Sequence, residues 1–110
     1  MEIIKITLEN YQQEISKSDK PVLLDFYADW CMPCKVVAGE LKAAAEEYDR
    51  VKFCKMDAEE CADLAMVYGI ISVPVLVLIK DGKEIARKLG GCEKQEIIDF
   101  CEATLVGSEE

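Results

Sequence analysis

The segment of residues 22–28 constrains the fold more than any other part of the sequence. It is a continuous run of β-favouring residues with a single charge, Asp25, near its middle. A run that is apolar on both faces predicts a strand buried at the centre of a sheet. The sequence Cys31-Met32-Pro33-Cys34 follows almost directly, and a helical pattern begins there. The fold must therefore hold two cysteines where a buried strand gives way to a helix.

Strand and helix patterns alternate along the rest of the chain. Apolar residues at three- and four-residue spacings, Val36 and Val37 among them, predict a long amphipathic helix from Met32 or Pro33 to about Tyr48. Thr7 is expected to cap an earlier helix that buries Leu8, Tyr11 and Ile15, and Gly69 to end a later one. The expected strands are residues 3–6, 22–28, 51–56, 74–80 and 84–89, and the other helices are residues 60–68 and one lined by Ile97, Cys101 and Leu105.

The order of these elements, βαβαβαββα, predicts an α/β fold with a mixed central sheet flanked by helices on both faces. Strands separated by helices are expected to pair in parallel, whereas Asp81-Gly82 predicts an antiparallel hairpin between the last two strands. The chain has 110 residues, of which 51% are hydrophobic and 32% charged, and no linker or repeat. We therefore expect a single domain over residues 1–110.

Charge and hydropathy exclude several classes of partner. Lys and Arg number 13 against 22 Asp and Glu, a net charge of -9, and no segment concentrates the basic residues. Binding to nucleic acid is therefore not expected. The longest mostly apolar stretch, residues 73–79, is about a third of a membrane-spanning helix. The first ten residues have neither a basic start nor a signal-length apolar run, so we expect a cytoplasmic protein without a membrane anchor.

The composition, which has no histidine and six cysteines, indicates that any catalytic chemistry depends on cysteine rather than histidine. The chain has no histidine, which excludes Ser-His and Cys-His nucleophilic pairs and HExxH metal sites. It has six cysteines, which in a reducing compartment indicate catalytic or metal-binding thiols rather than a disulfide scaffold. A zinc or iron-sulfur site is not expected, because no second CxxC follows Cys34 and no histidine can complete a tetrahedral set.

The CxxC spacing gains its meaning from its position. Six cysteines in a chain of this length produce such a spacing by chance about 0.3 times, so the spacing alone is weak evidence of function. Here it lies at a predicted helix start, where Pro33 is tolerated and where the helix dipole favours the Cys31 thiolate by about 0.3 to 2 kcal/mol. We therefore expect Cys31 to be the attacking sulfur and Cys34, one turn inside, the resolving thiol.

The sequence LLDFYADWCMPCK resembles the strand-to-active-site segment of the thioredoxin family. The order βαβαβαββα is similar to the family's fold over residues 3–106. The Val73-Pro74 step resembles the cis-proline that lies opposite the family's dithiol, and Gly82 and Gly90 match glycines in its last hairpin and after its final strand. The resemblance implies the thioredoxin fold and a reversible Cys31–Cys34 dithiol/disulfide.

The resemblance also implies roles for two charged residues. Asp25 is alone among apolar neighbours, so burial should raise its pKa and make it a proton acceptor for Cys34, the role that the resemblance assigns to it. Lys55 matches the buried lysine that pairs with this aspartate in bacterial thioredoxins. The alternative is a lysine that reaches solvent at a strand end.

A substrate-binding groove is implied around the two cysteines. Trp30 is expected to cover the disulfide and to form part of the docking surface, or alternatively only to anchor the strand end. Pro74 is expected to be cis, with the backbone before it pairing to an extended substrate segment, or alternatively to be only the start of an edge strand. The other groove residues implied are Met32, Pro33, Ile71, Ser72, Val73, Gly90 and Gly91, although Val73 could equally belong to the core.

Two residues depart from the family pattern. Met32 stands where thioredoxins typically have glycine, and residues between the cysteines help to set the reduction potential, about 30 mV for each 1.4 kcal/mol. Gly39 stands where the family often has a helix-kinking proline, and a glycine inside a helix costs about 1 kcal/mol relative to alanine.

The four remaining cysteines divide by their surroundings. Cys54 and Cys101 lie on apolar patterns and are expected in the core. Cys61, near a helix start, and Cys92, after two glycines, are expected to be exposed. Cys92 is expected near the docking face, which makes it a candidate for glutathionylation, intermolecular disulfides or regulation. Cys61 is a second candidate because a helix start favours its thiolate, and the alternative is that neither thiol has a role.

The expected function is that of a thioredoxin-like electron carrier that reduces protein disulfides. The resemblance implies no bound cofactor, a separate thioredoxin-reductase-like enzyme as electron donor, and a monomer. Two alternatives stay open: a thiol oxidant or isomerase whose potential Met32 raises, and a binding module of the same fold without turnover. The reduction potential distinguishes the first alternative, and failure to reduce any disulfide indicates the second.

Overall fold

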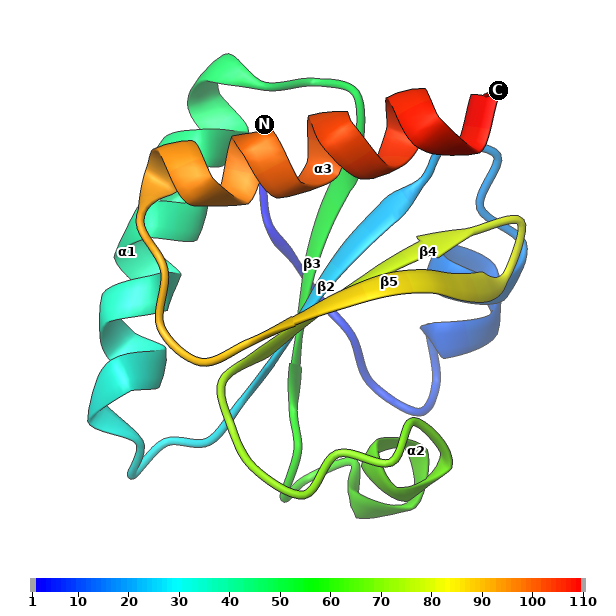
Figure 1. Ribbon diagram of the computed structural model, residues 1–110. Helices are drawn as coiled ribbons and strands as arrows, with labels where there is room; N and C mark the ends of the chain where they lie inside the picture. The colour runs from blue at the N-terminus through cyan, green and yellow to red at the C-terminus, as the bar shows by residue number, and fades with distance from the viewer. Residues whose placement is uncertain (1, 110) are drawn as a thin grey trace.

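A five-stranded mixed sheet forms the centre of the molecule (Figure 1). The computed structural model describes residues 2–109, with side chains as far as residue 107. The central strand β2 pairs in parallel with β3, which also pairs in parallel with β1, and β2, β4 and β5 are successively antiparallel. The strands, in spatial order, are β1 (Ile4–Lys5), β3 (Lys52–Asp57), β2 (Val22–Tyr27), β4 (Val75–Lys80) and β5 (Lys83–Leu89).

Helices cover both faces of the sheet, as the apolar run of β2 requires. Successive residues of a strand point to opposite faces, and accordingly Leu23 and Leu24 belong to two different cores. Helices α1 (Met32–Glu47) and α3 (Lys94–Glu109) pack on the face of Leu23. The short π-helix η1 (Gln12–Ser16) and α2 (Ala62–Val67) pack on the face of Leu24. The mixed α/β architecture is therefore confirmed, and it is that of the thioredoxin fold.

The direction of β4 differs from the simple rule applied to the sequence. A helix separates β3 from β4, yet β4 runs antiparallel to β2 and does not adjoin β3. Helix α2 has only six residues and spans about 9 Å, too little to carry the chain back along a six-residue strand of about 20 Å. The chain therefore re-enters the sheet from the end at which β3 leaves it (Figure 1).

The N-terminal helix begins later than the sequence predicts. Thr7 and Asn10 form reciprocal bonds, in which the Thr7 backbone N–H donates to Asn10 Oδ1 at 2.7 Å and the Asn10 N–H donates to Thr7 Oγ1 at 3.3 Å. Asn10 also donates to the Lys5 carbonyl. These bonds hold residues 8–10 in a turn, so Leu8 is exposed, while Ile15 of η1 is buried as expected.

The other element boundaries agree with the sequence to within one or two residues. The turn between β4 and β5 has Asp81 at φ 53° and Gly82 at φ 77°, the geometry of a two-residue hairpin. Gly69 follows α2 at φ 67°, the left-handed conformation that ends a helix. Within residues 2–109, no helix has both the length and the apolar character needed to cross a membrane.

Candidate active site

The two cysteines lie at the junction between the end of β2 and the start of α1. Cys31 is the N-cap residue of α1, with extended backbone, and Pro33 occupies the first helical turn. The backbone N–H of Cys34 donates to Cys31 Sγ at 3.2 Å, so an otherwise unpaired helix N–H is satisfied by the sulfur. Cys31 and Cys34 are joined in a disulfide, their Cα atoms are 5.2 Å apart, and both residues are buried.

The cis peptide at Val73-Pro74 lies beside this disulfide. Cys31 Sγ is 3.8 Å from the carbonyl oxygen of Val73. Trp30 is 69% exposed and does not pack as a core aromatic. A hollow of about 150 Å³, here called the Trp30 hollow, brings it together with the segment before the proline; its lining residues include Trp30, Glu59, Ile71, Ser72 and Val73.

A second hollow lies on the other side of the cysteine pair. It measures about 480 Å³ and is here called the Met32 hollow; it is lined by Met32, Pro33, Val36, Gly91, Cys92, Glu93 and Glu96. Gly90 lines neither hollow, and its N–H donates to the Pro74 carbonyl at 3.0 Å. The groove implied for the sequence is thus divided, with Trp30 and residues 71–73 on one side and Met32, Pro33 and Gly91 on the other.

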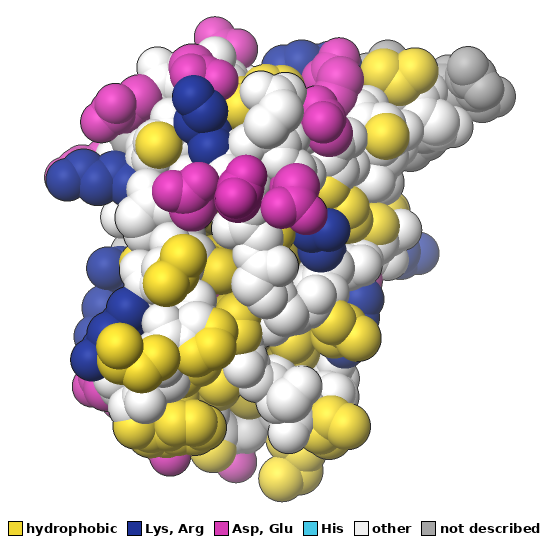
Figure 2. Space-filling view, turned by 60° about the vertical axis from the view of Figure 1, so that its left-hand side comes forward, with side chains coloured by type: hydrophobic (Ala, Val, Ile, Leu, Met, Phe, Trp, Pro, Cys, Tyr) yellow, Lys and Arg dark blue, Asp and Glu magenta, His cyan; other side chains and the backbone are white. Residues whose placement is uncertain are grey.

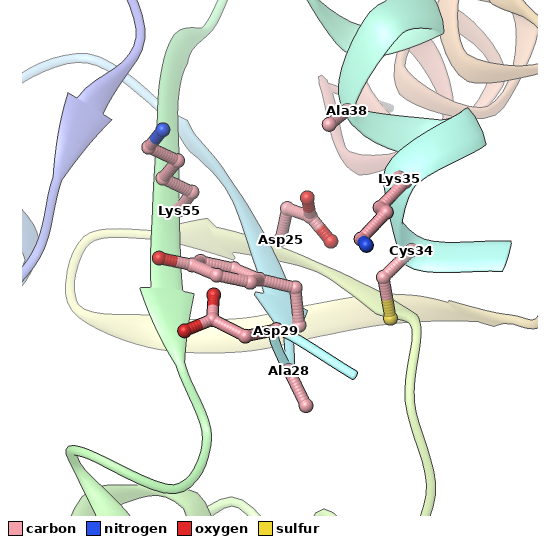
Figure 3. A pocket seen from close by; sticks show the side chains of 8 residues that line it. Asp25, Ala28, Asp29, Cys34, Lys35, Ala38 and Lys55 are labelled. Atoms are coloured by element: carbon pink, nitrogen blue, oxygen red, sulfur yellow. The ribbon is translucent and has the colours of Figure 1, made fainter. Parts of the chain in front are cut away.

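Asp25 is a buried carboxylate next to Cys34. It is 2% exposed, and its Oδ1 is buried without a hydrogen-bond partner among the described residues. Burial raises the pKa of Asp25 from 3.8 to about 7, and the positive charge of Lys55 opposes this rise. Asp25 and Cys34 line one hollow of about 160 Å³ together with Lys35, Ala38 and Lys55 (Figure 3).

Lys55 influences the pKa of Asp25 through the electrostatic effect of its positive charge, without direct contact between the two side chains. The two residues are register partners on β3 and β2, so both side chains lie on the same face of the sheet. Lys55 is half-buried rather than buried, and in the described part of the chain no ion pair joins it to Asp25. Figure 3 shows the Lys55 amine directed away from the carboxylate of Asp25, which points toward α1.

Two residues that the sequence pattern does not identify, Val36 and Ala38, help to shape the site. Val36 was expected on the apolar stripe of α1, but it is exposed and lines the Met32 hollow. Its neighbour Val37 is buried, and adjacent helical residues point about 100° apart, so only one of the two could face the core. Ala38 was not singled out, although it lines the hollow of Asp25 and Cys34. The pair of adjacent valines was the available signal.

The expectation that Cys61 and Cys92 are exposed is wrong. Cys61 is only 4% exposed, because α2 folds under the sheet and its Sγ lies 3.9 Å from the Ile6 carbonyl. Cys92 is 6% exposed, because the loop before α3 packs onto the core under α1. Burial raises the pKa of the Cys61 and Cys92 thiols. Cys54 and Cys101 lie in the core as expected, and burial raises the pKa of each of these two thiols to about 12.

The remaining chemistry of the site is that of sulfur. In residues 2–109 no three His, Cys, Asp or Glu side chains lie close enough to hold a metal ion. The site has one cysteine pair that can store two electrons, a helix start at one sulfur, and a carboxyl titrating near neutral pH at the other. Together with the fold, these features define a thiol-disulfide oxidoreductase.

Comparisons with known proteins identify the family of thiol-disulfide oxidoreductases to which the chain belongs. A family model described as Thioredoxin matches residues 2–103. The thioredoxin of Pseudomonas aeruginosa and thioredoxin C-2 of Corynebacterium nephridii are each 36% identical to it over 104 residues, 94% of this chain and 96% of the relative. The thioredoxin of Porphyra purpurea is 35% identical over 98 residues, 88% of this chain and 92% of the relative. The chain belongs to the thioredoxin family and is a disulfide reductase.

Proposed function

We propose that the protein carries electrons to disulfides of other proteins, with Cys31 as the attacking sulfur. The observation that carries this assignment is the position of Cys31 Sγ, which accepts the Cys34 N–H at the start of α1 and lies beside the Val73 carbonyl. The N–H bond and the helix start both stabilise a thiolate on Cys31, and the Val73 carbonyl marks the backbone segment beside which a substrate would lie. The Cys31 thiolate attacks one substrate sulfur, a mixed disulfide forms, and the other substrate sulfur leaves as a thiolate.

Cys34 then completes the transfer with the help of Asp25. The Cys34 thiol loses its proton to the Asp25 carboxylate and attacks Cys31, which releases the second substrate thiolate and forms the Cys31–Cys34 disulfide. A carboxyl with a pKa of about 7 can both accept and return this proton near neutral pH. Lys55 is a positioning residue in this step, because its charge limits the rise in the pKa of Asp25.

The substrate segment is proposed to lie across the disulfide in extended form. In this proposal, backbone atoms of residues 72–73 pair with it, as in strand addition. The cis peptide at Pro74 and the 3.8 Å distance from Cys31 Sγ to the Val73 carbonyl support the pairing. Its side chains then enter the hollows on the two sides. The residues proposed to contact it are Trp30, Met32, Pro33, Ile71, Ser72, Val73, Pro74, Gly90 and Gly91.

The cellular setting is part of the same proposal. The chain needs no bound cofactor, and a separate thioredoxin-reductase-like enzyme re-reduces the Cys31–Cys34 disulfide. We infer a cytoplasmic monomer that maintains thiols of other proteins, because the site is complete within one chain and a reducing compartment keeps substrate cysteines as thiols.

The assignment of the two sulfurs can be tested by trapping. A Cys34→Ser variant should accumulate a stable mixed disulfide with a protein that has an exposed disulfide, because Cys31 can attack and nothing resolves the product. A Cys31→Ser variant should form none and should lose turnover. Non-reducing gel electrophoresis and mass spectrometry identify the bridged residue, and a mixed disulfide through Cys34 would reverse the roles.

A further inference from the structure

The Met32 hollow has an apolar floor and an acidic rim. Met32 and Val36 of α1 are 68% and 64% exposed, although both side chains are hydrophobic. Cys92 closes the floor from the loop before α3, and Glu93 and Glu96 stand at the edge. The hollow holds about 480 Å³, within the range of roughly 300–1,000 Å³ in which proteins bind small groups, so it can accept a large side chain.

The exposed apolar residues form part of a larger surface around the start of α1. Figure 2 shows hydrophobic side chains gathered over the part of the molecule where α1 begins and α2 lies, with Asp and Glu side chains above them. A second copy of this chain is a poor occupant, since each copy has a net charge of -9. A partner that covers this surface must instead offer apolar side chains together with positive charge.

The charged side chains that line the Met32 and Trp30 hollows are all acidic, although Lys35 lines the separate hollow of Asp25 and Cys34. Glu93 and Glu96 line the Met32 hollow and Glu59 lines the Trp30 hollow, while no Lys or Arg of the described chain lines either. Glu96 is held by two contacts, since its Oε1 accepts the Glu93 N–H and Lys88 approaches its Oε2 at 3.9 Å. Within the described part of the chain no hydrogen bond or ion pair holds the Glu93 carboxylate, so its charge is available to a partner.

We propose that the Met32 hollow makes this reductase selective for disulfides flanked by a large apolar residue and an adjacent Lys or Arg. The apolar side chain enters between Met32 and Val36, and the cation faces Glu93 and Glu96. This inference rests on the proposed function, because it concerns the segment that Cys31 attacks.

The test uses ten-residue peptides whose single cysteine is a mixed disulfide with thionitrobenzoate. The Cys31 thiolate attacks the peptide sulfur and thionitrobenzoate leaves as a coloured thiolate; Cys34 then frees the peptide thiol. The peptides carry Leu-Lys, Leu-Glu, Ala-Lys or Ala-Glu next to the cysteine. With protein that has been reduced beforehand and freed of reductant, each molecule reduces one peptide. We expect the second-order rate constant for Leu-Lys to exceed that for Leu-Glu by about threefold to tenfold at low salt, and the ratio to approach one at about 0.5 M salt.

Two variants with matched controls locate the effect. Glu93→Gln should reduce the Lys-over-Glu ratio by about twofold or more, whereas Glu46→Gln, the same change at an exposed site on α1 away from the hollow, should not change it. Val36→Ser should reduce the Leu-over-Ala ratio by about threefold, whereas Val106→Ser on exposed α3 surface should leave it unchanged.

The outcomes separate the two proposals. If no peptide is reduced, the proposed reductase function fails. If all four peptides are reduced at equal rates, or if the acidic peptides are preferred, the reductase function stands and the selectivity of the Met32 hollow is overturned. The proposed selectivity is also overturned if neither Glu93→Gln nor Val36→Ser changes the ratios between peptides, because the preference then arises outside the Met32 hollow.

Discussion

Asp25 lowers the stability of the fold above neutral pH, where its buried carboxyl is charged. Its pKa rises from 3.8 to about 7 on folding because burial disfavours the charged form. The folded chain therefore binds the proton more tightly than the unfolded chain does. This tighter proton binding contributes fully to the unfolding free energy below about pH 4. The contribution falls by about 1.4 kcal/mol per pH unit as the pH rises from about 4 to about 7.

Replacement of Asp25 should therefore stabilise the oxidised protein most at high pH. We expect the gain in unfolding free energy of Asp25→Asn over the unaltered chain to be greater at pH 8 than at pH 5 by about 2 to 3 kcal/mol. Urea denaturation at the two pH values measures it, with Asp19→Asn, an exposed carboxyl, as the control. An equal gain at both pH values would contradict the raised pKa.

At the scale of the elements, helix α1 contains an interior glycine that lowers its stability and that alanine could replace. Gly39 lies in its interior, and a Cβ built there meets no atom within 4 Å. Gly39→Ala should raise the unfolding free energy by about 1 kcal/mol, because alanine loses less backbone entropy in a helix.

The matched control for Gly39 is a glycine that the backbone requires. Gly69 has φ 67°, where alanine is strained, so Gly69→Ala should lower the unfolding free energy by about 1 kcal/mol. Urea denaturation of the two variants checks both signs. A loss of stability in Gly39→Ala would show that α1 needs its glycine for a reason other than backbone freedom.

Elements with strong local patterns were predictable, and those decided by distant contacts were not. The apolar run of β2 and the helical period of α1 are enough to predict the cysteine pair at a strand-to-helix junction, which the structure has. The turn of residues 8–10 depends on bonds of Asn10 to Thr7 and Lys5, which hydropathy does not reveal. The burial of Cys92 likewise depends on how a loop packs against α1, a contact between segments far apart in the sequence.

At the scale of the whole molecule, the site exists only because three separate segments meet. Residues 30–34 follow β2, residues 71–74 precede β4, and residues 90–93 follow β5, and together they surround the cysteine pair with two hollows. The four other cysteines are buried in the two cores. Burial raises the pKa of these four thiols, whereas the start of α1 and the Cys34 N–H favour the thiolate of Cys31, so the six cysteines differ in reactivity rather than in exposure.

The central claim is that Cys31 and Cys34 form the single redox couple of a disulfide reductase. A redox titration in thiol buffers of defined potential, followed by Trp30 fluorescence and by mass spectrometric counting of alkylated cysteines, tests it most directly. We predict one two-electron transition near about -270 mV, the value typical of thioredoxins, with only Cys31 and Cys34 changing state. A transition above about -200 mV, oxidation of any other cysteine pair, or no transition at all would contradict the claim.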